Sequence, residues 1–156
     1  MDDQLFRTAM GKFATGVTVI ATETEEGPHG MTANAFMSVS LNPKLVVISI
    51  KENARILPKI QESKKFSVNI LAENQKEISM IFAGQLKDKE VSFGRLDEQP
   101  VIAGALANVT CEVSAEHIEG DHTLFIGKVT AIEVADGNPL LFANGRYQVL
   151  AESVEV

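Results

Sequence analysis

The sequence predicts a mainly β protein, an antiparallel barrel that is closed or nearly closed and carries a few peripheral helices. The first observation is that five or more segments have the composition or alternation of strands, three of them long and compatible with antiparallel pairing. The second is size, because 156 residues, 45% of them hydrophobic, suffice for one domain over residues 1–156 with a core that needs no metal or disulfide. A doubly wound sheet is therefore less favoured.

The N-terminal segment predicts an amphipathic helix over residues 3–14. Apolar side chains recur there at helical spacing behind the cap candidates Asp2 and Asp3, and Gly16 is expected to end the helix. The β-branched run VTVIAT at 17–22 then predicts the first strand.

The next elements are predicted to be short strands and one short helix. Residues 25–28 form the expected turn, and a second strand is expected to begin near Gly30. The apolar, β-rich segments 45–50 and 66–71 predict buried strands. A short helix is expected between them, with Pro58 compatible only with its first turn.

The second half predicts one more helix and two long strands. Asn74 and Glu77 resemble a capping box at the start of a helix that Gly84 ends, and residues 85–100 are polar and read as an exposed excursion. Apolar and polar side chains then alternate over 109–116, which predicts a strand with one wet face. A turn leads into a second long strand, 123–134.

Composition excludes several classes of function. The net charge of −7 without a basic block disfavours nucleic-acid binding. The longest clean apolar run, Leu45–Ile48, is too short to span a bilayer and no leader is expected, so the predicted location is cytoplasmic, away from membranes. Cys111 is the only cysteine, which excludes an internal disulfide, and three scattered histidines predict no metal site.

The segment Gly30–Ser40 is the first candidate for ligand binding. It mixes small, hydroxyl and amide side chains without a clean period, and neither of the common nucleotide-binding loops, GxGxxG or GxxxxGK, occurs in the chain. Such a segment can present backbone N–H groups to a ligand, or it can be a connection whose side chains bond their own backbone. Composition alone leaves both interpretations open.

In this region the sequence resembles a known family. The run GMTANAFMSVSLNP, preceded by FATGVTVI and followed by LVVISI, resembles the flavin reductase family with the FMN-binding split-barrel fold, an antiparallel Greek-key β-barrel. Further similar segments are FA at 82–83, GALA at 104–107, GDHTLFIGKV at 120–129 and PLLFANGRY at 139–147, so the resemblance spans nearly the whole chain.

The resemblance implies a homodimeric NAD(P)H:flavin oxidoreductase. It is closest to the short reductase components of two-component aromatic monooxygenases that act on phenol or 4-hydroxyphenylacetate, and these release reduced flavin to a separate oxygenase. The implied cofactors are FMN or FAD, with NADH or NADPH as co-substrate. Hydride transfer needs stacked rings, so positioning matters more than acid–base catalysis and the lack of a catalytic triad is no objection.

The resemblance also implies the residues that bind the flavin. Those expected along its ring and ribityl chain are Thr32, Ala33, Asn34, Ser38, Val39 and Ser40. Preorganised N–H and amide donors favour the negative charge that reduction places on the ring, and Asn34 is the best side-chain donor of this set. The segment implied for the flavin phosphate contains Ser49, Ile50, Lys51 and Arg55, whose two cations suit a helix N-terminus. The alternative is that Lys51 and Arg55 are ordinary solvated surface charges.

The remaining implied site residues are aromatic or titratable. Phe82, Ala83 and Phe93 are expected to contact the ring system, or adenine if FAD binds, although core packing is the simpler role for Phe82. The resemblance places His122 beside the flavin where nicotinamide docks, with solvation in a turn as the alternative. Tyr147 is a candidate for stacking on the dinucleotide, or for packing at the barrel end.

Two other functions remain open at this point. The rival is a flavin-binding carrier or sensor that lacks reductase activity. A less favoured third class is an enzyme similar to pyridoxamine-phosphate oxidases, because the sequence has no evident basic cluster for a second anionic substrate.

Overall fold

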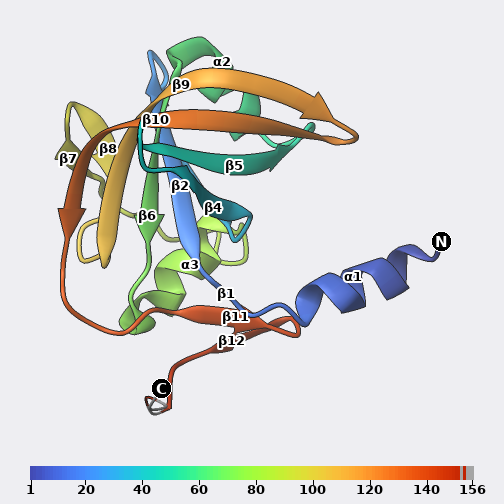
Figure 1. Cartoon of the computed structure of the whole chain (residues 1–156). Coiled ribbons are helices and arrows are strands. Elements are labelled where there is room, and N and C mark those ends of the chain that lie inside the picture. Colours follow the sequence, from blue (N-terminus) through green and yellow to red (C-terminus); the bar gives the residue numbers. More distant parts are fainter. Residues whose placement is uncertain (152, 154–156) are drawn as a thin grey trace.

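The computed structural model describes residues 1–151 and residue 153 (Figure 1). The helices are α1 (Asp3–Gly11), α2 (Ile56–Ser63) and α3 (Lys76–Phe82), with a 3₁₀ turn, η1 (Glu73–Gln75). The strands are β1 (Thr15–Gly16), β2 (Thr18–Thr24), β3 (Gly27–Ala33), β4 (Phe36–Ser40), β5 (Leu45–Lys51), β6 (Lys65–Ile70), β7 (Gly94–Leu96), β8 (Gln99–Val101), β9 (Ala107–Glu119), β10 (His122–Val134), β11 (Leu141–Ala143) and β12 (Arg146–Gln148).

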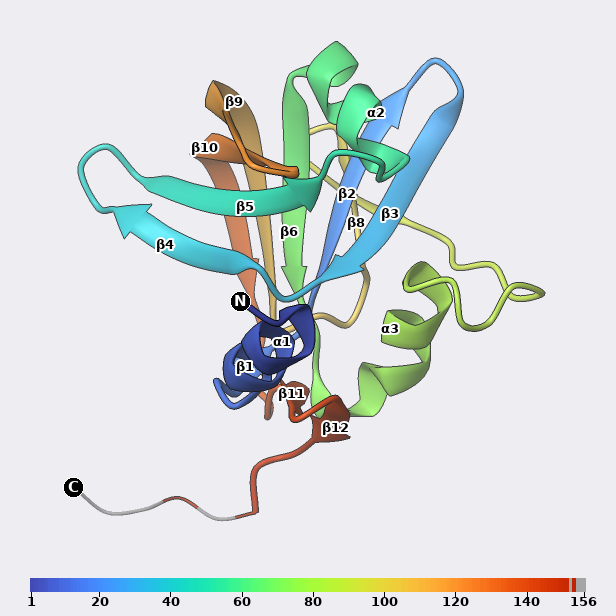
Figure 2. The ribbon, with the colours of Figure 1, turned by 90° about the vertical axis from the view of Figure 1, so that its right-hand side faces the viewer.

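A seven-stranded sheet forms the body of the protein, in the order β3-β2-β6-β9-β10-β5-β4. All of its strand pairs are antiparallel, which confirms the predicted fold class. The sheet curls so that its two edge strands, β3 and β4, lie at one seam and run apart from their common junction at Asn34 and Ala35 (Figure 2). The ladder is therefore not closed at this seam, and backbone edges face outward beside it.

The core consists of two clusters on opposite faces of β2. Ile20 belongs to the cluster inside the curled sheet, whereas Val19 belongs to the cluster under α3 and the C-terminal hairpin. On β5 the alternation is strict: Val46, Ile48 and Ile50 are buried, while the residues between them face outward. Alternate side chains of β5, the neighbour of edge strand β4, therefore face the core and the outside of the barrel.

Cys111, the only cysteine of the sequence, is buried in the core. Burial raises the pKa of the Cys111 thiol to about 12, so the thiol stays protonated at neutral pH and is no nucleophile.

Several boundaries differ from the predictions. The first helix ends at Gly11, with Lys12 as its C-cap, whereas Gly16 lies in β1. The second strand begins at Gly27, earlier than predicted, because a two-residue turn joins the paired residues Thr24 and Gly27, and Gly27 supplies the positive φ of 106°.

The predicted capping box at Asn74 and Glu77 is wrong. The helical segment begins two residues earlier, with Ala72 as its N-cap, and the Gln75 Oε1 atom accepts a hydrogen bond of 2.9 Å from the backbone N–H of Ala72. Pro58 does lie in the first turn of α2, as the prediction required, so its missing N–H costs no hydrogen bond.

Part of the predicted excursion at 85–100 is a small hairpin, β7–β8, with Gln99–Val101 buried. Its turn residues Asp97 and Glu98 both have positive φ, 49° and 59°. Sequence patterns for such turns rely on Asn-Gly or Asp-Gly, so an Asp-Glu turn carries little signal.

Helix α1 extends away from the sheet, and none of its residues is buried (Figures 1 and 2). The helix confirms the amphipathic prediction, but its apolar face is uncovered: Leu5, Phe6, Met10 and nearby Phe13 are each more than half exposed. No helix among residues 1–151 is long and apolar enough to cross a membrane.

We expect Gly127→Ala to destabilise the fold by roughly 1–3 kcal/mol, because a core this tightly packed must shift to admit a methyl group. A Cβ atom at Gly127 would lie 2.5 Å from the Phe66 ring and 2.8 Å from the Cys111 Cβ. Urea unfolding measures the change. The matched control is Gly16→Ala, since a Cβ there meets no atom within 4 Å. Equal stability of both variants would contradict the packing at Gly127.

Candidate functional site

Three adjoining pockets follow β3 along the open seam. We call them the cationic pocket (about 580 Å³, beside Gly30 and Met31), the tyrosine pocket (about 180 Å³, beside Thr32 and Ala33) and the apolar pocket (about 430 Å³, beside Ala35). Ala83 lines both the cationic and the tyrosine pocket, and Asn34 lines both the tyrosine and the apolar pocket. We call this row of adjoining pockets the β3 groove.

Because Gly30 has no side chain, the Phe82 ring can lie directly against β3 and form a wall of the groove. A Cβ at Gly30 would lie 2.8 Å from the Phe82 ring, so the ring passes directly over the backbone of β3. Phe82 in turn packs against Phe93, with ring centroids 5.5 Å apart and a tilt of 46°. Both rings are partly buried and also pack against the second core cluster, as the simpler interpretation of Phe82 predicted.

Hydrogen bonds fix the tyrosine pocket from three elements. The Ser79 and Tyr147 hydroxyl oxygens lie 2.7 Å apart, and Thr32 Oγ1 donates to the Ser79 carbonyl oxygen at 2.6 Å. The Tyr147 ring meets Phe142 edge-on at 5.4 Å, and Lys76 Nζ lies 5.5 Å from its centroid. Tyr147 is therefore held firmly, with its position set by α3 and β11.

Polar groups at the junction of the tyrosine and apolar pockets are available to a ligand. The Asn34 side chain is exposed and makes no hydrogen bond within the described residues. The Thr15 hydroxyl oxygen is buried with no partner in that same part of the chain, and Thr15 lines the apolar pocket. Leaving a buried hydroxyl without a partner costs about 1–3 kcal/mol, so the pocket is suited to a polar ligand atom.

Arg55 lies where the sequence predicted a phosphate ligand, at the N-cap of α2, and it lines the cationic pocket. Lys51 ends β5 and flanks the same turn, because its carbonyl oxygen accepts a hydrogen bond from Ala54 N–H at 3.0 Å. The positive end of a helix beside two cations favours an anion.

His122 lies outside the three pockets but on the same sheet face as the apolar pocket. It pairs with Lys51 across β10 and β5, and Leu124, two residues farther along β10, lines the apolar pocket. Two residues of strand span roughly 7 Å, so His122 lies about that far along β10 from Leu124, on the same face. Its Nδ1 atom lies 2.8 Å from Asp121 Oδ1, and this hydrogen bond lowers the pKa of the Asp121 carboxyl.

Other predicted site residues lie farther from the groove. The Ile50 side chain is fully buried in the core, so only its backbone could approach a ligand, whereas its neighbour Ser49 lines the apolar pocket. Ser38, Val39 and Ser40 continue along β4 beyond the apolar pocket, toward the turn to β5. Phe93 packs on Phe82 and lines a neighbouring pocket that shares Ile81, Phe82 and Lys89 with the cationic pocket.

Sequence reasoning missed several residues that shape the groove: Thr15, Ser79, Lys87 and Phe142. Ser79 occupies a helix position with no motif around it, and its hydroxyl partner is 68 residues away. No local pattern signals such a contact.

An antiparallel barrel that is open at one seam, with a groove beside the seam that changes from cationic to polar to apolar, is a split barrel. The flavin reductase like domain matches residues 10–151 of the chain. The protein therefore belongs to the flavin reductase family.

Individual relatives agree with this assignment. An NADH-dependent flavin reductase of Rhodococcus sp is 43% identical over 148 residues, which cover 92% of this chain and 84% of the relative. The reductase component of 4-hydroxyphenylacetate 3-monooxygenase from Thermus thermophilus is 38% identical over 148 residues, covering 94% of this chain and 96% of the relative.

Solved structures agree as well. The flavin reductase PheA2 in its native state superposes with a TM-score of 0.95 at 61% identity, over 97% of this chain and 100% of that chain. The NADH:FAD oxidoreductase SgcE6 of Streptomyces globisporus C-1027, in complex with NAD and FAD fragments, superposes with a TM-score of 0.88 at 33% identity, over 98% of this chain and 96% of that chain.

Proposed function

We propose that the protein reduces FAD or FMN with NADH as hydride donor and supplies the reduced flavin to a separate monooxygenase. Membership of the flavin reductase family, over residues 10–151, is the observation that carries this proposal. The names of the relatives from Rhodococcus and Thermus support NADH and the monooxygenase partner. The location that fits this role is the cytoplasm.

The β3 groove fits a flavin by its donors. The unpaired amide of Asn34 and the unpartnered hydroxyl of Thr15 are available where a ring with several polar edge atoms would lie. Thr32 and Ala33 would line the ring from β3, and Arg55 and Lys51 would hold a phosphate at the start of α2. A bound flavin supplies the ring nitrogen that accepts the hydride.

The chain contributes to the reaction by positioning. Tyr147, fixed by Ser79 and Phe142, supplies a rigid aromatic wall that limits how a ligand can lie in the tyrosine pocket. Asn34 would favour the extra negative charge that reduction produces, because a preorganised donor stabilises the charged ring more than the neutral one. His122, oriented by Asp121, would orient the nicotinamide from the rim of the apolar pocket.

The proposed assembly is a homodimer in which a second copy covers α1 and the apolar pocket. The apolar face of α1 is uncovered, and exposed Phe13 and Met37 both line the apolar pocket, next to Asn34. Burying these side chains against a second copy would remove a large apolar surface from water and would also shield the groove.

We expect Phe6→Glu to raise the dissociation constant of this dimer by about tenfold or more, since each copy loses a buried aromatic side chain and gains a charge at the interface. Light scattering after size-exclusion chromatography measures the mass. Gln4→Glu is the matched control, because it adds the same charge to the other side of the same helix. A native protein that elutes as a monomer, or a Phe6 variant that remains as dimeric as the control, contradicts this assembly.

Steady-state turnover tests the proposed function. The purified protein is mixed with FMN or FAD and with NADH or NADPH, and nicotinamide oxidation is followed by absorbance. We expect oxidation of NADH that depends on added flavin and on the protein. Flavin binding without oxidation of either nicotinamide would instead identify the carrier or sensor.

A further inference from the structure

Ser79 of α3 is fully buried, and two hydrogen bonds reach it from strands of two different sheets. Thr32 Oγ1 of β3 donates to its carbonyl oxygen at 2.6 Å, and the hydroxyl oxygen of Tyr147 in β12 lies 2.7 Å from its own hydroxyl oxygen. Thr32, Ser79 and Tyr147 all line the tyrosine pocket. A single residue of α3 therefore joins the strand wall of this pocket to the hairpin wall.

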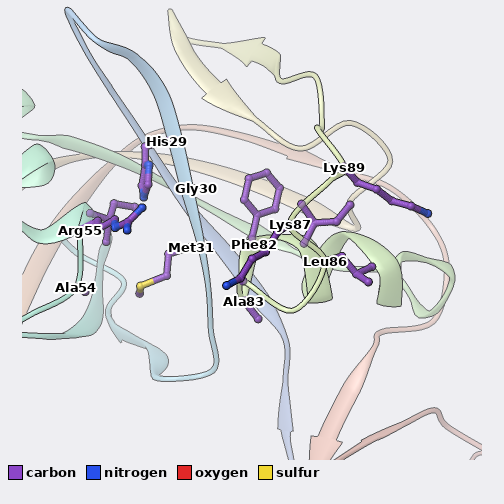
Figure 3. A pocket seen from close by; sticks show the side chains of 13 residues that line it. His29, Gly30, Met31, Ala54, Arg55, Phe82, Ala83, Leu86, Lys87 and Lys89 are labelled. Atoms are coloured by element: carbon purple, nitrogen blue, oxygen red, sulfur yellow. The ribbon is translucent and has the colours of Figure 1, made fainter.

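The strand wall is fixed without the side chain of Ser79. The bond from Thr32 ends on a carbonyl oxygen, which belongs to the backbone of α3. The Phe82 ring also lies against β3, since a Cβ at Gly30 would be only 2.8 Å from it. Figure 3 shows Phe82 at the end of α3, beside Gly30 of β3. Loss of the Ser79 hydroxyl would thus leave α3 and β3 in place.

The hairpin wall depends on the Ser79 hydroxyl. Tyr147 lies in β12, an edge strand of the small sheet β1-β11-β12. Within residues 1–151, its contact with Ser79 is the only hydrogen bond between α3 and the β11–β12 hairpin. The other neighbours of the ring, Phe142 and the Lys76 amine, lie 5.4 and 5.5 Å from its centroid and do not hold the hydroxyl end. Because hydrogen bonds are directional, the bond to Ser79 determines where the ring points.

Serine is an unfavourable residue at this helical position unless its hydroxyl is used. Alanine has the higher helix propensity, and a buried hydroxyl without a partner destabilises the fold. Helical serines often bond a carbonyl of the preceding turn, but in the described part of the chain the Ser79 hydroxyl bonds Tyr147 instead. The side chain therefore serves the pocket rather than the helix.

The tyrosine pocket has room for only part of a ligand. Its volume of about 180 Å³ is below the roughly 300–1,000 Å³ of complete small-molecule sites, so it suits one ring system rather than a whole nucleotide. A flat ring is kept from tilting only while the walls beside it keep their separation. Hydride transfer needs stacked rings, and misplacing a reacting group by about 1 Å can slow a reaction roughly 100-fold.

We propose that Ser79 is a positioning residue of the reaction, which acts through the Tyr147 hydroxyl and sets the width of the tyrosine pocket. This inference rests on the proposed function. Without the Ser79 hydroxyl, the Tyr147 ring turns away from α3 and a ring bound in the pocket is free to tilt. The loss appears in the rate of hydride transfer, whereas the barrel stays folded.

Ser79→Ala and Tyr147→Phe each remove one half of this hydrogen bond. We expect each variant, loaded with flavin, to be reduced about tenfold more slowly at saturating NADH in a stopped-flow measurement. The double variant should lose no more than either single variant, because the same bond is lost in all three. Effects that multiply in the double variant, or a native rate in Ser79→Ala, would overturn the inference.

Ser67→Ala is the matched control for a structural effect. Ser67 is also fully buried, and its hydroxyl donates to the Pro100 carbonyl oxygen at 2.6 Å, but it lines none of the three pockets. We expect both serine variants to melt at a lower temperature and only Ser79→Ala to be reduced more slowly. Equal losses of rate in the two variants would show that Ser79 has a structural role only, against the inference.

Tyr147 also provides a readout that does not depend on activity. It is the only tyrosine of the sequence, so NMR of protein labelled with ring-¹³C tyrosine shows Tyr147 alone. We expect Ser79→Ala to shift these signals and Ser67→Ala to leave them in place. If the native protein does not oxidise NADH, the proposed function fails, while shifted signals still show that Ser79 holds Tyr147. If NADH is oxidised but Ser79→Ala changes neither the signals nor the rate, only the inference on Ser79 fails.

Discussion

Asn34→Ala is expected to weaken flavin binding roughly 5- to 150-fold, which corresponds to about 1–3 kcal/mol for a hydrogen bond that the bound ring would bury. Asn34 lies at the junction of the tyrosine and apolar pockets, and its amide has no partner within the described residues. The fold should not suffer, because the side chain makes no contact that the core needs. Fluorescence titration with FMN and FAD measures the affinity, and thermal melting measures the stability.

Asn74→Ala is the matched control for this variant. Asn74 is also an exposed asparagine, but it lies in η1 outside the groove. We expect native affinity and native turnover in the control. If Asn34→Ala behaves like Asn74→Ala, Asn34 does not belong to the site.

His122→Ala is expected to bind oxidised flavin nearly as well as the native protein and to reduce it roughly 10- to 100-fold more slowly with NADH. The side chain is held by Asp121 on the sheet face that continues the apolar pocket, and its partner across the sheet is Lys51 of β5. A residue that orients nicotinamide is needed only when hydride moves, so its loss raises the Michaelis constant, lowers the rate of reduction, or both.

Anaerobic stopped-flow reduction, read beside a melting curve, separates this role from a structural one. Glu116→Ala is the control, since Glu116 is an exposed residue of the same hairpin that pairs with Phe125 on the other face of β10 and lines none of the three pockets. If His122 has a purely structural role, the variant should melt at a lower temperature, and its flavin affinity and its rate of reduction by NADH should decrease together. Native reduction kinetics over a range of NADH concentrations would remove His122 from the reaction.

Strand periodicity predicted much of the barrel. The alternation on β9 and the apolar runs of β5 and β6 are local signals that burial on one or both faces imposes directly on the sequence. The amphipathic pattern of α1 was equally clear, but it indicated a face to be covered without indicating what covers it. The small β7–β8 hairpin was not predicted, because its strands of three residues are too short to show an alternating pattern and an Asp-Glu turn is not a typical hairpin turn.

The candidate site was predictable only through family resemblance. Arg55, Asn34 and Tyr147 come from three distant segments, and only the curled sheet with its open seam brings β3, α2 and the C-terminal hairpin to one groove. The contacts that fix Tyr147 depend on Ser79, whose hydroxyl has no sequence signature. Lys87 could not be predicted as a pocket residue either, because a lysine in a polar loop is ordinarily solvated.

A crystal structure of the protein with bound FAD tests the central claim most directly. The account predicts the isoalloxazine ring against Thr32–Asn34 at the seam between β3 and β4, with a phosphate at Arg55 and the start of α2. A flavin bound away from the β3 groove, for example on the outer face of the β9–β10 hairpin, would contradict it.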